Sequence, residues 1–455
     1  MIEYDLVIKN GLIINAFSSF KANIGINDDE ITSISKLQLL GTKSIDADGL
    51  LVFPGIIDPH VHFELPMKDA VSADDFISGT RAAVFGGVTT VLDFSTQSKG
   101  ENLLDAIAKR KQLIKEGIFC NVGMHCGITD GETSDGDIKK AIEMGYSSFK
   151  MFTAYRDRGM MLDDGELLKI LESIKNHGGL PAFHAENSPI IEQLTKKFLT
   201  EGKTDPIYHA LSRPDYAEEE AILRCCFLAQ LVHSDILFVH IGSKKGMQAI
   251  ERSRSQYGIS IYSETCPHYL FLTDDLFMGE TGHLYLLSPP LRKKTDQEYL
   301  WHALAAGKID IIGTDHCLFT KEQKGNGTLP FDKVPNGLMG VETSLPLVYH
   351  GIVNQRNLPV QLIPKIMSYN PAKIYRIKKR GIIAPGQVAD ITLLDPRREM
   401  TIGSENLHMP SNWNAYEGME VKGWPVTTII NGMIVVEDLE LCTSKGPGKQ
   451  INRVL

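Results

Sequence analysis

The sequence lacks the features typical of membrane, secreted and nucleic-acid-binding proteins. No apolar run reaches the about 20 residues that a membrane helix needs. The first residues, MIEYDLVIKNGLIIN, contain no basic segment followed by an apolar one, so we expect no signal peptide. No block of like charges stands out, although the net charge is −9. We therefore expect neither a nucleic-acid partner nor a membrane partner.

Cysteine usage argues against a disulfide framework. The seven cysteines are an odd number, are scattered and form no CxxC pair. This usage fits a reducing cytoplasm, where we expect the protein to reside. Cys225 and Cys226 adjoin in an apolar helical stretch, so we interpret them as packing residues.

The middle of the chain has the rhythm of an α/β barrel. The chain has 455 residues, enough for one large domain and a smaller one. From Val52 onward, short apolar strands alternate with amphipathic helical stretches, and eight such strands predict a TIM-like (β/α)₈ barrel over about residues 54–380. A doubly wound open sheet is the alternative, but it usually has fewer strands. The expected strands are Leu51–Ile57, Thr89–Phe94, Cys120–Cys126, Ser147–Phe152, Pro181–His184, Ile236–Ile241, Ser260–Thr265 and Ile309–Thr314. The expected helices are Ala73–Phe85, Asn102–Glu116, Asp135–Met144, Asp164–Asn176, Tyr216–Val232, Lys245–Tyr257 and Asp296–Ala306.

The two chain ends resemble each other in being rich in short strands. We expect them to pair into one small β-sandwich domain made of residues 1–53 and 381–455. Asn431-Gly432 is a strong hairpin signal within the last strand region. The tail after Glu440 is rich in Lys, Gly and Pro, so we expect it to pack on another subunit or to be partly mobile. The expected strands are Asp5–Asn15, Ala22–Asn27, Glu30–Lys36, Ala389–Leu394 and Thr427–Val436.

A histidine pair ends the first expected barrel strand. His60 and His62 lie two residues apart, so their side chains point the same way from an extended chain. They would converge just past the carboxyl end of the strand, where barrels build their active sites. Two neutral imidazoles aimed at one point suit a transition metal ion.

Four more polar residues fall at the carboxyl ends of other expected strands. They are Lys150, His184, His240 and Asp315. Taken singly, a strand-end His or Asp often caps the next helix. Taken together with the histidine pair, the set predicts a metal site.

Lys150 is the unusual member of the set, because it lies in a strand that should be buried. An unpaired buried ammonium is costly. One interpretation is an ion pair with Asp315 or a glutamate. The other is that the amine reacts with CO₂ to form a carbamate, whose two oxygens would bridge two metal ions.

Several longer motifs resemble the dihydropyrimidinase/D-hydantoinase family of cyclic amidohydrolases, within the amidohydrolase superfamily. The order HxH, Lys, His, His, Asp on eight strands is that of the superfamily. The motifs that match the narrower family are DPHVHFELP, SADDFISGTRAAVFGGVTTVLDF, SSFKMFTAY, FHAEN, ETCPHYLFL, LSPPLR, GTDHCLF and PNGLMGVE. With VFPGIID before them and GIIAPGQVADITLLDP after them, the resemblance spans nearly the whole chain.

The resemblance implies a centre of two divalent metal ions, expected to be Zn²⁺. His60 and His62 would hold the more buried ion with Asp315, and His184 and His240 the more exposed one. N6-carboxylated Lys150 and a hydroxide would bridge the two ions. Relatives of this kind are usually homotetramers or homodimers, so the resemblance implies such an assembly here.

The expected chemistry is hydrolysis of a cyclic amide. Two metal ions would lower the pKa of a bridging water, and the hydroxide would attack the ring carbonyl carbon. Asp315 would take the proton and pass it to the leaving ring nitrogen, or act as a metal ligand only. The family resemblance implies that Tyr155 donates to the developing oxyanion; a packing aromatic is the alternative. We expect the substrate's polar groups to meet backbone at two loops, where Ser288 and Asn336 match the family's imide-binding positions; without the resemblance, we would interpret both as turn residues.

One difference from the dihydroorotases, a related group of enzymes, narrows the expected substrate class. Dihydroorotases carry an arginine two residues after HxH, which binds the substrate carboxylate, whereas this position is Glu64 here. Like charges repel, so dihydroorotate is disfavoured. We expect dihydropyrimidines or 5-substituted hydantoins as substrates. An apolar wall around the exocyclic substituent is expected from Phe63, Leu65, Met67, Phe152 and Met160.

Three alternatives differ in function while sharing the barrel. Allantoinases also contain ETCPHYL, so an allantoinase-like enzyme stays open. Some relatives keep the fold, lose metal ligands and act as scaffolds, but this chain keeps all six ligand positions and Tyr155. A nucleophilic Cys317 beside His316 is disfavoured, because neighbours on a strand point to opposite faces. We interpret Cys317 as a small buried hydrophobic residue whose oxidation could inhibit the enzyme.

Overall fold

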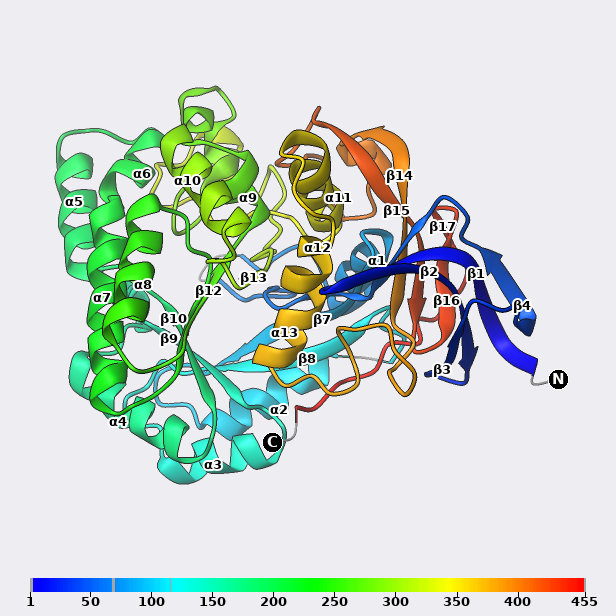
Figure 1. Ribbon diagram of the computed structural model, residues 1–455. Coiled ribbons are helices and arrows are strands. Elements are labelled where there is room, and N and C mark those ends of the chain that lie inside the picture. Colours follow the sequence, from blue (N-terminus) through cyan, green and yellow to red (C-terminus); the bar gives the residue numbers. More distant parts are fainter. Residues whose placement is uncertain (1–2, 68–69, 115, 454–455) are drawn as a thin grey trace.

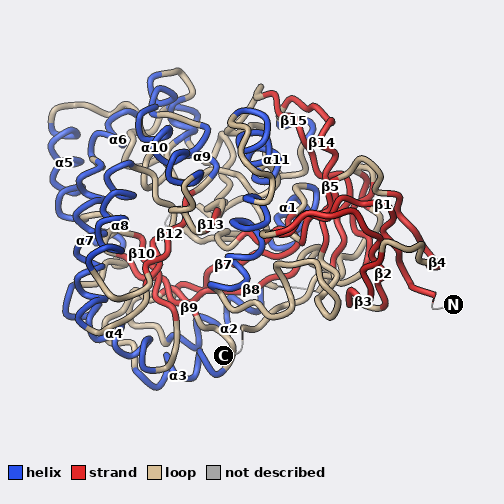
Figure 2. The backbone as a smooth tube through the Cα atoms, in the orientation of Figure 1, coloured by secondary structure: helices blue, strands red, loops and turns tan. Residues whose placement is uncertain are grey.

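The structure is a computed structural model that describes residues 3–67, 70–114 and 116–453 and consists of a barrel beside a separate sheet (Figure 1). Helices surround the barrel strands, and strands from both chain ends form the separate sheet (Figure 2). The predicted fold class, a barrel plus a β domain built from both ends, is confirmed. Within the described ranges, no helix is both long and apolar enough to cross a membrane.

Eight parallel strands form the barrel in chain order. The first and last strands meet at their carboxyl ends, where Asp58 accepts hydrogen bonds from the Thr314 amide (3.0 Å) and hydroxyl (2.6 Å). These bonds bring the segments that carry the histidine pair and Asp315 side by side. The strands are β6 (Ile56–Asp58), β7 (Val88–Thr96), β8 (Asn121–Gly127), β9 (Ser148–Phe152), β10 (Leu180–His184), β11 (Ile236–Phe238), β12 (Ile261–Thr265) and β13 (Ile311–Ile312).

The first predicted strand, Leu51–Ile57, is in fact two strands in different sheets. Residues up to Pro54 pair with the separate sheet, and the barrel strand starts at Ile56. Gly55 lies at the crossing, where an added Cβ would come within 2.1 Å of the Thr89 hydroxyl oxygen. Only glycine allows this close approach, so the apolar run can pass from one sheet to the other.

Helices follow the strands at the predicted places, and the structure adds further helices that were not predicted. All seven predicted helices are present within a few residues; residue 115, inside the predicted helix 102–116, lies outside the described residues. α5 and α6 were not predicted, although Asn187 caps α5 and a proline follows in its first turn. The helices are α1 (Phe76–Phe85), α2 (Leu103–Leu113), α3 (Asp135–Glu143), α4 (Asp164–Asn176), α5 (Ser188–Thr200), α6 (Ile207–Ser212), α7 (Asp215–Leu231), α8 (Lys244–Gln256), α9 (Pro267–Phe271), α10 (Lys294–Ala305), α11 (Ser344–Tyr349), α12 (Leu362–Pro364) and α13 (Asn370–Ile374).

The separate sheet joins strands from both chain ends into one hydrogen-bonded network. It buries its own apolar cluster, which includes Ile24, Ile391 and Ile429. The predicted hairpin at Asn431-Gly432 is confirmed, and both residues have the positive φ that such a turn requires. The domain bounds 1–53, 54–380 and 381–455 stay a prediction. The strands are β1 (Glu3–Asn15), β2 (Ser18–Asn27), β3 (Glu30–Ser35), β4 (Leu40–Asp46), β5 (Leu51–Pro54), β14 (Ile391–Thr401), β15 (Glu420–Ile430), β16 (Met433–Glu437) and β17 (Glu440–Leu441).

The tail after Glu440 packs on the barrel of its own chain as far as Arg453, which corrects the expectation of a mobile segment, whereas a contact with another subunit stays a prediction. The Val122 amide donates to the Lys449 carbonyl (2.9 Å), and the Ile451 amide donates to the Val122 carbonyl (2.9 Å). Arg453 is buried and donates to the Ser148 hydroxyl (2.7 Å). The described end of the chain therefore lies near α2 and α3, as Figure 1 shows.

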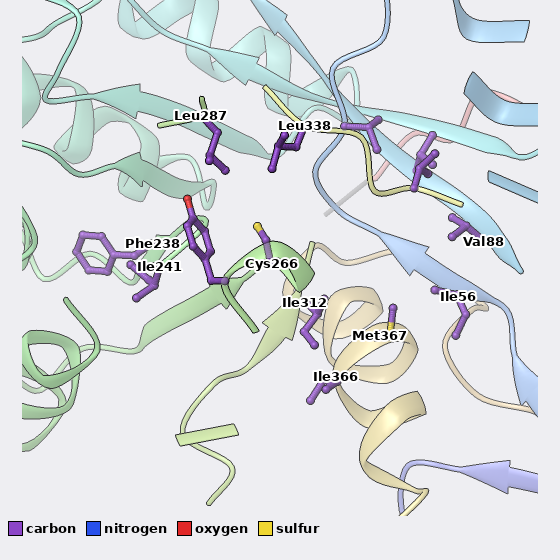
Figure 3. Close-up of a cluster of buried hydrophobic side chains, with 14 of the residues drawn as sticks. Ile56, Val88, Phe238, Ile241, Cys266, Leu287, Ile312, Leu338, Ile366 and Met367 are labelled. Atoms are coloured by element: carbon purple, nitrogen blue, oxygen red, sulfur yellow. The ribbon is translucent and has the colours of Figure 1, made fainter. Parts of the chain in front are cut away.

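The barrel core is a continuous apolar cluster that extends into the neighbouring helical turns. Figure 3 shows Ile56 and Ile312 from the strands gathered with Ile366 and Met367 from the helical segment between α12 and α13. This packing fixes the strand ends from which the candidate site is built. All seven cysteines are free thiols, and Cys225 and Cys226 are buried on α7, as their packing interpretation predicted.

Candidate metal centre

The histidine pair and Asp315 meet at the carboxyl end of the barrel. The Nε2 atoms of His60 and His62 each lie 3.1 Å from Asp315 Oδ1. One ligand atom from each of the three residues falls within 4.8 Å of the others. Imidazole nitrogens and a carboxylate oxygen at this spacing fit a transition metal ion.

The charges at His62 and Asp315 suit metal ligation, whereas at His60 burial and Lys150 oppose protonation but the Glu264 and Asp315 carboxylates raise its pKa. Burial lowers the pKa of His62 to about 3, so its imidazole is neutral. Burial opposes ionisation of Asp315, but the imidazoles of His60 and His62 hold its pKa well below the usual range. Neutral imidazoles and an ionised carboxylate are the protonation states that bind metal ions.

His184 and His240 form a second pair beside the first. His184 ends β10 and His240 follows β11, and the distance from His184 Nδ1 to His240 Nε2 is 3.0 Å. The ring centroids of His60 and His240 are 5.5 Å apart, so the two clusters are adjacent. Burial lowers the pKa values of both His184 and His240, which keeps both imidazoles neutral.

Lys150 lies on β9, next to both clusters. Its Nζ is 2.9 Å from His60 Nε2 and 4.5 Å from the ring centroid of Phe94. The side chain is buried, and burial lowers the pKa of its amine. No described carboxylate comes within ion-pair distance of Nζ, so the ion-pair interpretation finds no support in the described part of the chain.

Two buried glutamates orient the histidines from behind, and sequence analysis missed both. Glu264 Oε1 lies 2.6 Å from His60 Nδ1 and accepts from the His240 amide at 3.1 Å. Glu186 Oε2 lies 2.9 Å from His184 Nε2 and accepts from Arg213 at 2.7 Å. Burial opposes ionisation of Glu186, but Arg213 helps lower its pKa to about 2. Carboxylates behind ligating imidazoles fix ring orientation and tautomer.

Tyr155, Ser288 and Asn336 come together near the second histidine pair. The ring centroids of Tyr155 and His184 are 4.8 Å apart, and burial raises the pKa of the Tyr155 phenol to about 12. The Ser288 hydroxyl accepts a hydrogen bond from Asn336 Nδ2 at 3.0 Å and is near enough to Tyr155 to affect the pKa of its phenol. Asn336 Oδ1 is buried and has no partner among the described residues. The group thus offers a phenol donor, a hydroxyl and an open amide acceptor.

The predicted substrate wall is only partly placed near these groups. Phe152 is buried with its ring 6.1 Å from that of His184, and the Met160 amide donates to the Tyr155 carbonyl at 3.1 Å. Met67 Sδ lies 4.0 Å from an Arg158 nitrogen, which links two loops at the barrel mouth. Leu65 is partly buried on the first of these loops, where its amide donates to the Ser72 hydroxyl (2.8 Å).

Phe63 is a core residue rather than a wall residue. It is fully buried, and its ring packs against that of Phe76 on α1 at 5.7 Å between centroids. The physical reason is alternation along the extended chain: Phe63 follows His62, so their side chains leave opposite faces.

Cys317 does not have the environment of a nucleophile. Its thiol is buried, and burial raises its pKa. A thiol needs a lowered pKa to react as thiolate near neutral pH. The neighbouring His316 imidazole is engaged by Asp74, at 2.7 Å from Nε2.

Comparison with known proteins finds relatives that match nearly the whole chain. The model of the amidohydrolase family matches residues 51–435. A D-hydantoinase of Geobacillus stearothermophilus is 39% identical, with 98% of this chain and 96% of that protein covered. A dihydropyrimidinase of Dictyostelium discoideum is 34% identical, with 98% and 90% covered. The crystal structure of a dihydropyrimidinase from Brevibacillus agri matches with a TM-score of 0.95 at 35% identity, with 98% of each chain covered.

Proposed function

The chain belongs to the amidohydrolase family, among its D-hydantoinase and dihydropyrimidinase members, and from this premise we propose that it hydrolyses the cyclic amide bond of dihydropyrimidines or 5-substituted hydantoins. The observation that carries the proposal is the meeting of two histidine pairs, Lys150 and Asp315 at one end of the barrel. Such a set also argues against a scaffold protein that has lost its ligands.

We assign the ligands to two divalent metal ions, expected to be Zn²⁺. His60, His62 and Asp315 would hold one ion, His184 and His240 the other, and N6-carboxylated Lys150 both. The short distances between their ligand atoms support this assignment. When bound, the ions would supply hydroxide near neutral pH by lowering the pKa of a water.

Two side chains of the protein would act on the substrate ring in different roles. Asp315 would take the proton of the attacking water and deliver it to the ring nitrogen as the carbon–nitrogen bond breaks. Tyr155 would donate its hydroxyl to the carbonyl oxygen as negative charge develops there. A matched oxyanion donor contributes about 3–4 kcal/mol to lowering the barrier. The raised pKa of Tyr155 keeps its proton available for donation.

Ser288 and Asn336 would hold the imide edge of the ring. The unpaired Asn336 Oδ1 is suited to accept from a ring N–H, because an unpaired buried acceptor is costly when no ligand is bound. Leu65, Met67, Phe152 and Met160 are proposed to limit the substituent at the ring. Glu64 at the barrel mouth disfavours a substrate that carries its own carboxylate.

We further propose a cytoplasmic homodimer or homotetramer. The seven free thiols support a reducing compartment. Tyr216, Phe227 and Leu231 are each more than half exposed on α7, and such apolar exposure on one helix supports a subunit contact. Sedimentation analysis of the wild type and of Phe227→Lys tests this: the assembly should weaken in the variant.

The function is tested by following ring opening of dihydrouracil and of a 5-substituted hydantoin by zinc-loaded protein with bicarbonate. Allantoin serves as the comparison substrate. Turnover of either of the first two, abolished by a chelator, is expected. Rapid turnover of allantoin alone would indicate the allantoinase alternative. No turnover of any of the three substrates would overturn the proposal.

A further inference from the structure

Lys324 is a second buried lysine, which forms no hydrogen bond or ion pair with the proposed metal ligands in the described part of the chain and is unused by the chemistry above. Its side chain is fully buried in the loop that follows β13 and Asp315. No described carboxylate pairs with it, and burial lowers the pKa of its amine to about 7. Burying an amine without a counter-ion costs free energy, so the groups that bind the Lys324 amine must compensate for that cost.

The two acceptors of Lys324 belong to two different loops. Its Nζ donates to the Leu286 carbonyl at 3.0 Å and to the Pro335 carbonyl at 3.0 Å. The Leu286 carbonyl also accepts from the Gly337 amide at 2.9 Å. The Leu286 carbonyl therefore accepts from both Lys324 and the loop of Gly337. The Lys324 Nζ in turn binds one carbonyl of each loop.

These two loops are the ones that carry Ser288 and Asn336. Ser288 follows Leu286 by two residues, and Asn336 directly follows Pro335. The two side chains meet in a hydrogen bond of 3.0 Å. Lys324 thus fixes the backbone on which both proposed substrate contacts are mounted.

The loop that carries Asn336 is also held on the side that faces Cys317. Gly337 has φ of +152°, and an added Cβ would lie 2.5 Å from the Cys317 carbonyl oxygen. The Cys317 amide donates to the Leu338 carbonyl at 2.8 Å. The loop is therefore held against the Asp315 segment on one side and against the Leu286 loop on the other, both by the direct Gly337–Leu286 bond and through Lys324.

We infer that Lys324 is a positioning residue for substrate binding, which sets the spacing between the loops of Ser288 and Asn336 so that both side chains reach one flat imide edge. This inference rests on the proposed function. It assigns Lys324 no contact with the substrate or the reacting atoms. Its role is to keep two binding groups in register, as preorganised sites require.

The test is Lys324→Met, which keeps an unbranched side chain and removes the donors. Lys321→Met, three residues earlier on a partly exposed side chain, makes the same chemical change without the loop contacts. Steady-state ring opening of the better hydantoin or dihydropyrimidine substrate is measured with zinc content and melting temperature. Losing bonds to two buried carbonyls should raise KM about tenfold while kcat changes less than about twofold. Zinc content should stay unchanged, and Lys321→Met should match the wild type.

A double-mutant cycle separates positioning from general loosening of the fold. In a Ser288→Ala/Asn336→Ala background, Lys324→Met should raise KM by less than about twofold, because the groups that it positions are gone. A full tenfold rise in that background, or an unchanged KM in the single variant, would overturn the inference. If Lys324→Met does not fold, Lys324→Gln, which retains one donor group, enters the same cycle with the same criteria. A wild type that opens neither ring would instead defeat the proposed function.

Discussion

The two halves of the centre differ in the charge that their own side chains bring to a metal ion. The acidic half consists of His60, His62 and Asp315, with both imidazoles facing one carboxylate oxygen. The neutral half consists of His184 and His240, which face each other. Glu186 bonds to the far nitrogen of His184, so it orients the ring without entering the neutral half.

From this difference we expect Lys150 to matter more to the neutral half than to the acidic half. Two neutral imidazoles offer no negative charge to a divalent cation, whereas the acidic half has its own carboxylate. A carbamate on Lys150 would add an anionic ligand between the halves, next to His60. We therefore expect the neutral half to depend on Lys150 for holding its metal ion.

Lys150→Ala should have the largest effect. Bound zinc should fall from two equivalents per chain to one, and ring opening should drop by about three orders of magnitude or more, because the shared ligand is lost. Metal analysis and turnover are measured on the same sample. Added acetate or propionate should restore part of both, since a free carboxylate can take the place of the carbamate. Full activity in the variant would rule the carbamate out.

Asp315→Asn tests the acidic half. The amide cannot accept and deliver a proton, so kcat should fall by about two to four orders of magnitude. Zinc content is determined alongside kcat, because a variant that keeps zinc isolates the proton-transfer role from ligation. Turnover near that of the wild type would remove Asp315 from that role.

The two buried glutamates offer a matched pair of milder changes. Glu186→Gln alters the support of His184 only, whereas Glu264→Gln alters the supports of both His60 and His240. Loss of such an outer carboxylate costs about 10–100-fold in metal affinity. Competition with a chelator should therefore show one weakened zinc in Glu186→Gln and two in Glu264→Gln. Equal behaviour of the two variants would contradict the division into halves.

A small effect on stability is expected at Glu218, which accepts from the Gly242 amide behind the neutral half. Burial raises the pKa of Glu218 on α7 to about 7, above its value of 4.5 in the unfolded chain. Between these values the folded state binds more protons than the unfolded state, so this group's contribution to stability falls as pH rises from 4.5 to 7. Glu218→Gln should remove that fall and raise the melting temperature relative to the wild type more at pH 8 than at pH 4.5. The neighbouring, partly exposed Glu219→Gln is the control; an equal gain at both pH values would show another cause.

Much of this architecture could be read from local patterns, because strand alternation and strand-end polar residues are local features. In this way the sequence predicts one set of strand-end residues, which the structure brings to one end of the barrel: His60, His62, Lys150, His184, His240 and Asp315. Gly55 was missed because one apolar run does not reveal that it crosses between two sheets. Phe63 was misplaced although its alternation with His62 already directed it to the core. Lys324 and the tail depend on carbonyls far away in sequence, which no local pattern reports.

The most direct test of the central claim is ¹³C NMR of zinc-loaded protein prepared with ¹³C-labelled bicarbonate. The account predicts one protein-bound carbamate signal per chain, present in the wild type and absent both in Lys150→Ala and after chelation. A wild type that holds two zinc ions and opens the ring without any such signal would contradict the bridging role of Lys150.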